Sequence, residues 1–285
     1  MKTLSDRLFL YAKLMRLDKP VGILLLLWPT WWALWLASAG IPTWKNFIIF
    51  TLGVILMRSA GCVVNDLADR HFDKHVQRTE RRPLAQNQIS LIAVLGLAAV
   101  LAAIALGLVW QCNRLTIQLA FMGAGLAVLY PFLKRVTHLP QLGLGFAFSW
   151  GIIMAYAAVQ NALPSSAWVL YGAAVLWPII YDTYYAMVDR VDDEKIGVKS
   201  TAILFAGYEI QFLALLQAVC VILLVWVGQI NQLSSTYYVA LIGVVINFVY
   251  QLQLIRSAQR SNYFLAFQVS HYVGLIIFLG IALSV

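Results

Sequence analysis

Long stretches without a charged residue recur along the chain, and a helical membrane span needs roughly 20 apolar residues. Six stretches are clean: Val21–Ala39, Ile89–Trp110, Leu115–Leu133, Leu142–Val159, Tyr237–Ile255 and Phe264–Val285. Three more carry or follow a charge: Phe47–Val64 contains Arg58, Ala167–Met187 contains Asp182, and Ile210–Ile230 follows Glu209. These runs are too long for barrel strands and do not alternate in polarity. The sequence therefore predicts an all-α, polytopic membrane protein with nine transmembrane helices.

The composition fits a membrane protein and excludes a nucleic-acid partner. Hydrophobic residues make up 62% of the chain and charged residues only 11%, whereas a soluble domain averages about 25% charged residues. The formal net charge of +8 is explained by basic loops on the cytoplasmic side of a membrane and by their attraction to anionic lipid. No basic, soluble module is present that would bind nucleic acid.

The distribution of lysine and arginine predicts the orientation, because short basic loops stay in the cytoplasm. With a cytoplasmic N-terminus, all but three of the 20 basic residues lie on the cytoplasmic side. The exceptions are Lys45 and Arg114, which lie outside, and Arg58, which lies within a span. We therefore expect one domain, residues 1–285, in which residues 1–19 lie at the membrane interface. Residues 66–88 and 189–201 are expected to form two long cytoplasmic loops.

Two short clusters contain most of the 12 acidic residues, and each lies at the predicted cytoplasmic end of an apolar helix. The first cluster comprises Asn65, Asp66, Asp69 and Asp73, and the second comprises Asp182, Asp189 and Asp193. At about 100° per residue, the members of each cluster share one helix face. Acidic side chains at membrane depth are costly and usually functional. Because carboxylate and amide oxygens suit Mg²⁺ or Mn²⁺, the two clusters together predict one cavity that binds divalent cations.

Basic residues follow the acidic clusters and suit a diphosphate group, which Mg²⁺ bridges to carboxylates. The candidates are Arg78, Arg81, Arg82, Lys134, Arg135, Lys195 and Lys199. Tyr130 and Lys134 lie one turn apart around a proline, so we expect them on one face. For Arg81 and Arg82, a role in topology alone explains the sequence equally well. Arg58 is expected either to contact the diphosphate or acidic cluster, or to extend toward the interface.

The predicted first span is unusually rich in tryptophan. It contains Trp28, Trp31, Trp32 and Trp35. Interfacial anchoring is the more frequent reason for such density. A cavity lined by these rings, which would shelter a carbocation through their quadrupoles, is the alternative.

The motif Asn65-Asp66-x-x-Asp69-x-x-x-Asp73, followed by Arg82-Pro83, and the motif Asp189-x-x-x-Asp193 resemble the two aspartate-rich motifs of the UbiA superfamily of intramembrane prenyltransferases. Tyr130-x-x-x-Lys134 resembles a third motif of that superfamily. The segments 16–20, 61–66 and 181–204 are similar to the branch of bacterial 4-hydroxybenzoate polyprenyltransferases. The resemblance covers nearly the whole chain, and the pair of aspartate motifs is far more specific than either motif alone.

This resemblance implies nine helices around a central cavity, a cap of cytoplasmic loops and a lateral opening to lipid. It implies Mg²⁺-dependent transfer of a polyprenyl group from polyprenyl diphosphate to the ring carbon ortho to the hydroxyl of 4-hydroxybenzoate. That reaction belongs to ubiquinone biosynthesis. The expected location is the bacterial cytoplasmic (inner) membrane, with the active site facing the cytoplasm and the protein in contact with membrane lipid. The oligomeric state stays open.

As a hypothesis, the resemblance together with the positions of the charged residues assigns roles to individual residues. The metal ligands are expected to be Asn65, Asp66, Asp69, Asp73, Asp189 and Asp193. The catalytic residues are expected to be Asp69, Asp73, Asp189, Asp182 and Lys134, and the substrate-binding residues Arg16, Arg58, Arg78, Tyr130, Arg135 and Lys199. Asp182 is the candidate for orienting the acceptor or receiving the ring proton. Arg16 is the candidate for binding the acceptor carboxylate, and a charge that only sets topology is the equal alternative.

Other functions remain compatible with these residues. One is the same chemistry on another acceptor, such as naphthoate, homogentisate, haem or a chlorophyll precursor. A divalent-cation transporter would also use intramembrane carboxylates, although both clusters are expected on one side of the membrane with no polar path across it. A non-catalytic scaffold would bind polyprenyl diphosphate without releasing diphosphate.

Overall fold

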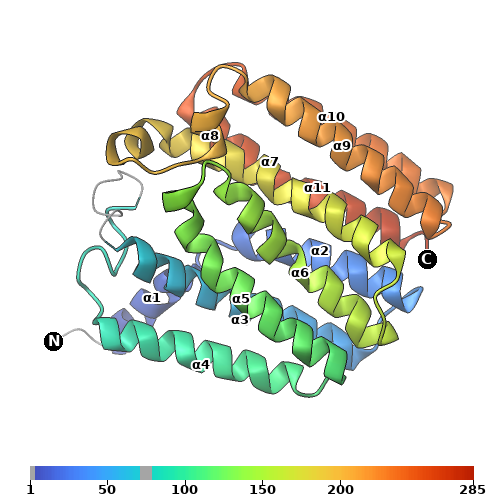
Figure 1. Ribbon diagram of the computed structural model, residues 1–285, viewed down its shortest axis with the longest axis horizontal. Helices are drawn as coiled ribbons and strands as arrows, with labels where there is room; N and C mark the ends of the chain where they lie inside the picture. Colours follow the sequence, from blue (N-terminus) through green and yellow to red (C-terminus); the bar gives the residue numbers. More distant parts are fainter. Residues whose placement is uncertain (1–3, 71–78) are drawn as a thin grey trace.

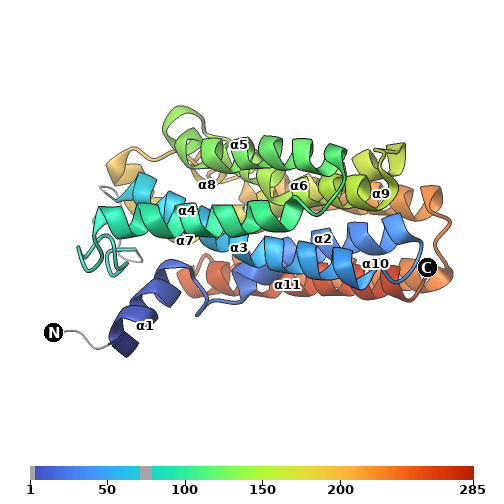
Figure 2. The same cartoon turned by 90° about the horizontal axis from the view of Figure 1, so that it is seen from below.

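The computed structural model describes residues 4–70 and 79–285, and all regular secondary structure within these residues is helical. The helices are α1 (Leu4–Leu14), α2 (Val21–Ser38), α3 (Trp44–Asp69), α4 (Leu91–Val109), α5 (Arg114–Val136), α6 (Pro140–Gln160), α7 (Ser165–Ile196), α8 (Thr201–Leu204), α9 (Glu209–Ile230), α10 (Ser235–Ile255) and α11 (Arg260–Ala282). The long helices lie side by side along one axis (Figure 1). Short α1 and α8 lie at one end of this bundle, and the C-terminus lies at the opposite end (Figures 1 and 2).

Each predicted span corresponds to one long helix, so the all-α class is confirmed. Within the described residues, eight helices are long and apolar enough to cross a membrane by length and composition, namely α2, α3, α4, α5, α6, α9, α10 and α11. The remaining predicted span, Ala167–Met187, corresponds to α7, which is not one of these eight. Helix α7 is the longest, with 32 residues, and it packs against α6, α9 and α11.

Polar side chains begin several of these helices at the residue before the first turn. Thr43, Ser90, Asn113 and Ser200 each accept a hydrogen bond from the backbone N–H three residues on, at the starts of α3, α4, α5 and α8. Such N-caps satisfy backbone donors that have no partner inside the helix. These four polar residues therefore mark where the helices begin.

The prediction of a loop over residues 189–201 was wrong for most of that segment, because α7 continues to Ile196. No proline or glycine interrupts the chain between Pro178 and Gly197, so the helix extends past its apolar part. Gly197 ends it with φ of 73°, a left-handed conformation that glycine adopts without strain. The α3 helix likewise includes Asp66 and Asp69. The carboxylates of both clusters within the described residues therefore lie on rigid helices.

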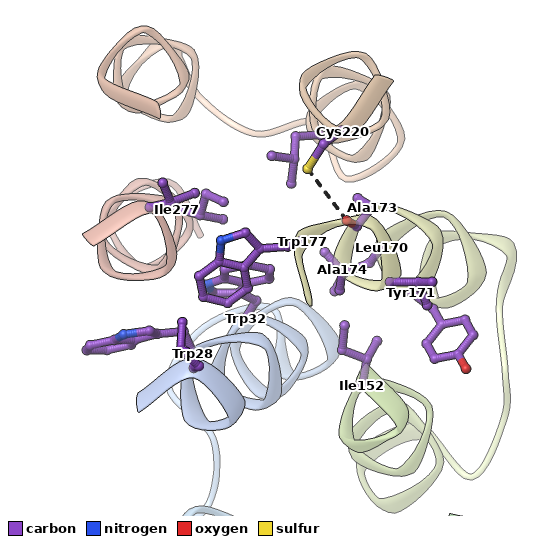
Figure 3. Close-up of a cluster of buried hydrophobic side chains, with 14 of the residues drawn as sticks. Trp28, Trp32, Ile152, Leu170, Tyr171, Ala173, Ala174, Trp177, Cys220 and Ile277 are labelled. Carbon is purple, nitrogen blue, oxygen red and sulfur yellow. Dashed lines mark hydrogen bonds between the residues drawn. The ribbon is translucent and has the colours of Figure 1, made fainter. Parts of the chain in front are cut away.

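Tryptophans from α2 and α7 lie among the buried hydrophobic side chains of the core, as Figure 3 shows. The rings of Trp32 and Trp177 lie 5.4 Å apart, measured between centroids. The indole Nε1 of Trp32 donates to the carbonyl oxygen of Gly274 in α11, at 2.9 Å. The α11 backbone can approach these rings because residue 274 has no side chain. Trp32 therefore connects α2 with both α7 and α11.

We expect Gly274→Ala to destabilise the fold by roughly 1–3 kcal/mol, the usual effect of overpacking a core. An added Cβ would lie 2.4 Å from Cδ1 of Trp28 and 2.5 Å from Cη2 of Trp177. Gly96→Ala is the matched control, because nothing lies within 4 Å of its added Cβ and the residue is exposed on α4. Thermal unfolding of the detergent-solubilised protein measures both, and equal melting temperatures for the two variants would contradict the expectation.

Candidate active site

Two cavities meet inside the bundle and share part of their walls. The smaller one, of about 170 Å³, is lined mainly by polar residues and lies at the ends of α3, α5 and α7. The larger one, of about 520 Å³, is mainly apolar and extends between α2, α3, α4, α5 and α6. We call them the polar and the apolar compartment. The residues that line both are Asn65, Arg82, Tyr130, Asp182 and Tyr185.

The polar compartment brings together the two acidic clusters, as the sequence predicted. Asn65 and Asp69 come from α3, and Asp189 and Asp193 come from α7. Each pair is spaced by four residues, so both members lie on the helix face toward the compartment. Asp69 and Asp189 are buried, with relative exposures of 2% and 6% for the whole residues. One pocket therefore holds acidic groups that are more than 100 residues apart in the sequence.

Lys134 supplies a positive charge beside the first cluster. Its ammonium group forms an ion pair with Oδ2 of Asp69 and also lines the polar compartment. Nη2 of Arg135 lies 4.0 Å from Oδ1 of Asp69. The backbone N–H of Lys199 donates to the carbonyl oxygen of Lys134, at 3.0 Å, and its Nζ donates to the carbonyl oxygen of Val136, at 3.1 Å. These contacts fix the end of α5 against the segment after α7.

The residues around the polar compartment fit Mg²⁺ by their chemistry. Asn65, Asp69, Asp189 and Asp193 supply the hard oxygen donors that this ion prefers. The buried Oδ1 of Asp69 has no hydrogen-bond partner within the described part of the chain. In that same part, no three His, Cys, Asp or Glu side chains form a group that would hold one ion. The donors thus form separate groups on two walls, which suits ions whose shell is completed by substrate phosphate oxygens.

Asp66 is placed differently from the other members of its cluster. Its carboxylate accepts hydrogen bonds from Nη2 of Arg16, at 2.8 Å and 3.1 Å, and forms an ion pair with Nη1 of Arg82, at 3.0 Å. It lines the apolar compartment but not the polar one. The sequence grouped Asp66 with the metal ligands, whereas the structure pairs it with two guanidinium groups.

Arg58 lies on the wall of the apolar compartment, about two turns before Asn65 on α3. Its Nε donates to the carbonyl oxygen of Gly22, at 3.3 Å, and its Nη1 contacts Sγ of Cys62. The guanidinium group also lies 6.0 Å from the ring centroid of Phe148. The guanidinium group of Arg58 therefore faces protein and the apolar compartment, and these contacts do not include side chains that line only the polar compartment.

Sequence reasoning missed several side chains of the polar compartment. Tyr185 lines both compartments, and Gln141 lines the polar one. Tyr185 lies three residues after Asp182 and four before Asp189, so helical spacing alone would have found it. Gln141 had no such signal: its Oε1 accepts a hydrogen bond from the backbone N–H of Thr201, 60 residues away.

The tryptophans of the first span do not line the two compartments, and two charged residues of the predicted site lie outside the described part of the chain. None of Trp28, Trp31, Trp32 and Trp35 lines either compartment, so these rings do not surround the site. Asp73 and Arg78 lie outside the described residues, and their expected roles stay predictions.

Comparisons with known proteins identify relatives of nearly the whole chain. Residues 26–280 match the UbiA prenyltransferase family. A protein of Edwardsiella ictaluri named 4-hydroxybenzoate octaprenyltransferase is 52% identical over 274 residues, covering 96% of each chain. A protein of Aeromonas hydrophila with the same name is 52% identical over 280 residues, covering 98% of each chain.

Solved structures share the fold. The apo structure of a UbiA homologue from Aeropyrum pernix K1 superposes with a TM-score of 0.81 at 22% identity, covering 91% of this chain and 97% of the other. A UbiA homologue from Archaeoglobus fulgidus, bound to GPP and Mg²⁺, superposes with a TM-score of 0.71 at 17% identity, covering 94% and 99%. The family match and the identity with full-length relatives lead to one conclusion: the chain belongs to the UbiA prenyltransferase family.

Proposed function

We propose that the chain transfers a polyprenyl group from polyprenyl diphosphate to 4-hydroxybenzoate. The expected polyprenyl group is octaprenyl, as in the names of the relatives. The observation that carries the proposal is the identity with relatives of that name over nearly the whole chain. The two joined compartments support it, because the donor has a charged head and a long apolar tail. An enzyme of this kind serves ubiquinone biosynthesis.

The donor diphosphate is assigned to the polar compartment and its prenyl chain to the apolar one. Lys134 and Lys199 line the polar compartment and offset part of the charge of the diphosphate. Arg82 lines both compartments and is suited to the bridging oxygen at their boundary. The reacting carbon of the prenyl group then lies near Tyr130, Asp182 and Tyr185, which form the shared wall.

Mg²⁺ would be held by Asn65 and Asp69 on α3 and by Asp189 and Asp193 on α7, with Asp73 as the further predicted ligand. When bound, it supplies Lewis-acid stabilisation of the leaving diphosphate. Lys134 keeps the Asp69 carboxylate in place through their ion pair. Because both acidic pairs lie on rigid helices, they are arranged before the substrate arrives, which lowers the cost of organising the charged site.

In the reaction, the bond between the allylic carbon and the diphosphate oxygen breaks, and the electron pair leaves with the diphosphate. The ring carbon ortho to the hydroxyl forms the new carbon–carbon bond, and its proton leaves to a base. Asp182 is the assigned base or orienting group, because it lies on the wall shared by both compartments. Arg58 and Arg16 line the apolar compartment and are assigned to the acceptor carboxylate.

The finer topology is part of the same proposal. Helix α7 is assigned as a membrane span in addition to the other eight. Its 32 residues give a length of about 48 Å, which is longer than a hydrocarbon core of about 30 Å. Its C-terminal turns then carry Asp189 and Asp193 out to the surface of the membrane. With the N-terminus in the cytoplasm, the polar compartment faces the cytoplasm, and the membrane is the bacterial inner membrane.

Membranes that contain the chain are expected to convert radiolabelled 4-hydroxybenzoate to a lipid-soluble product when octaprenyl diphosphate and Mg²⁺ are supplied. EDTA is expected to abolish the product, because the diphosphate and the acidic walls repel one another without the cation. Product formation that is indifferent to EDTA would contradict the metal assignment. No product from folded protein would reject this acceptor, and the same assay with naphthoate or homogentisate would then identify another.

A cation transporter is disfavoured by the position of the acidic groups. Both clusters line a single compartment at one end of the bundle, and the adjoining compartment is mainly apolar. Uptake of Mn²⁺ into vesicles that contain the protein, without substrate, is therefore expected to equal that of empty vesicles. Uptake above that level would reopen the transport reading.

A further inference from the structure

Asp66 lies where three separate parts of the chain meet at the mouth of the apolar compartment. We propose that Asp66 is a positioning residue, which fixes the guanidinium groups of Arg16 and Arg82 for the anionic substrates, and that it is not a metal ligand. The inference rests on the proposed function and specifies how its anion-binding groups are held.

The geometry of this triad is that of a buried charge with two partners. The Asp66 side chain is 1% exposed, and those of Arg16 and Arg82 are 15% and 16% exposed. Arg16 reaches both carboxylate oxygens through one nitrogen, at 2.8 Å and 3.1 Å, and Arg82 approaches Oδ1, at 3.0 Å. Two guanidinium groups and one carboxylate leave one net positive charge, at a place where all three residues line the apolar compartment.

This pairing opposes a role for Asp66 in metal binding. A carboxylate that accepts charge-assisted hydrogen bonds from two arginines is held strongly by them. A divalent cation at Asp66 would displace these guanidinium groups or lie beside two positive charges. Asp69, by contrast, lines the polar compartment and has a buried oxygen without a hydrogen-bond partner in the described chain. Two neighbouring carboxylates of one motif thus have different surroundings.

The two arginines come from segments that need an anchor. Arg16 lies between α1 and α2 with φ of 57°, and its Nη1 donates to the carbonyl oxygen of Lys13, at 2.9 Å. This left-handed conformation is uncommon for a residue with a side chain. Arg82 lies in the turns before α4, where its backbone N–H donates to the carbonyl oxygen of Thr79, at 2.9 Å. Thr79 itself lines the polar compartment. Asp66 therefore connects the N-terminal segment and this turn to the site.

The same segments are also held by apolar packing, so the fold does not depend on Asp66 alone. Leu14 from α1, Val63 from α3 and Leu84 from the turns before α4 belong to one buried cluster. A variant that loses the Asp66 charge keeps this cluster. The expected loss is the orientation of Arg16 and Arg82 rather than the fold.

The first test compares Asp66→Asn with Asp69→Asn in the transfer assay. For Asp66→Asn we expect KM for octaprenyl diphosphate, 4-hydroxybenzoate or both to rise about 10- to 100-fold, because Arg16 and Arg82 then lose the charged partner that holds them. The Mg²⁺ concentration for half-maximal rate is expected to stay at the wild-type value. For Asp69→Asn that concentration is expected to rise. An increased Mg²⁺ requirement in Asp66→Asn as well would overturn the proposal.

Two further variants keep this test sharp. Asp66→Glu retains the charge and is expected to recover part of the lost affinity, while Arg16→Gln is expected to raise KM in the same direction as Asp66→Asn. If Asp66→Asn does not accumulate in membranes, Arg16→Gln provides the comparison. Asp192→Asn is the matched control, because Asp192 pairs with Arg260, at 2.9 Å, and lines neither compartment. We expect its KM values to equal those of the wild type.

The second test needs no activity. Trypsin must bind the Arg16 side chain to cleave after it, and in the wild type this guanidinium group is engaged by Asp66. We expect Asp66→Asn to increase cleavage after Arg16, measured by mass spectrometry of the detergent-solubilised protein, and Asp192→Asn to leave it unchanged. Equal cleavage in the wild type and Asp66→Asn would overturn the positioning role. Failure of transfer in the wild type would reject the proposed function while leaving this result interpretable.

Discussion

Asp69→Ala is expected to lower prenyl transfer by about 10²–10³-fold or more, the range seen when one preorganised electrostatic group is removed from an active site. The Asp69 carboxylate is buried, lines the polar compartment and forms the ion pair that holds Lys134. Its loss removes a donor for Mg²⁺ and leaves the Lys134 ammonium group without its partner. Both changes weaken the site where the diphosphate charge is stabilised.

Asp189→Ala is expected to have a loss of the same order, because Asp189 supplies the opposite wall. Asp192→Ala is the control on the same helix: three residues further on, its side chain pairs with Arg260 instead of lining the compartment. Transfer rates in membranes, normalised to the amount of folded protein, measure all three variants. Wild-type turnover by Asp69→Ala or Asp189→Ala would reject the assigned site.

The arrangement within each acidic cluster could be predicted because it depends on local regularity. Four-residue spacing places Asn65 with Asp69, and Asp189 with Asp193, on one face of each helix whatever the rest of the fold does. Hydropathy then predicts the helices themselves, since each predicted span corresponds to one helix. The polar compartment contains these four residues together with Lys134, as the motifs suggested.

What the sequence did not predict depends on contacts between distant segments. One partner of Asp66, Arg16, is 50 residues away, and no local pattern in the sequence predicts that contact. The helical course of α7 through Ile196 was also missed, because its last turns are polar and such residues resemble a loop by composition. For the tryptophans of α2 the sequence favours interfacial anchoring, and it does not show which of them packs inside: the contacts of Trp32 with Trp177 and Gly274 make it part of the core.

One face of α3 offers a way to change the donor that the enzyme accepts. Gly53, Met57, Gly61 and Asn65 follow one another at intervals of four residues, and all four line the apolar compartment. Nothing lies within 4 Å of a Cβ added at Gly53 or Gly61. A larger side chain at either position therefore grows into the compartment and not into neighbouring protein. This face borders the path assigned to the prenyl chain.

We expect Gly61→Phe to lower transfer roughly 10- to 100-fold for every prenyl donor. The added ring would clash with the bound prenyl group, and overpacking of this size costs about 1–3 kcal/mol. Gly61 lies one turn from Asn65, so the added ring occupies the space beside the first isoprene units. Gly53 lies two turns further along α3, a distance of about 12 Å at 1.5 Å per residue. Gly53→Phe is therefore expected to reject octaprenyl diphosphate and to retain dimethylallyl diphosphate.

Transfer measured with dimethylallyl, geranyl and octaprenyl diphosphates separates these two variants. Gly96→Phe is the control for the substitution itself, because Gly96 is exposed on α4, has no atom near its added Cβ and lines neither compartment. If Gly53→Phe reduces transfer from all three donors equally, the chain does not run along α3 toward Gly53. If Gly61→Phe uses every donor at the wild-type rate, the prenyl group lies outside the apolar compartment. The expected order, with short donors tolerated only when the obstacle is far from Asn65, follows from a single path that begins at the diphosphate and continues along this face.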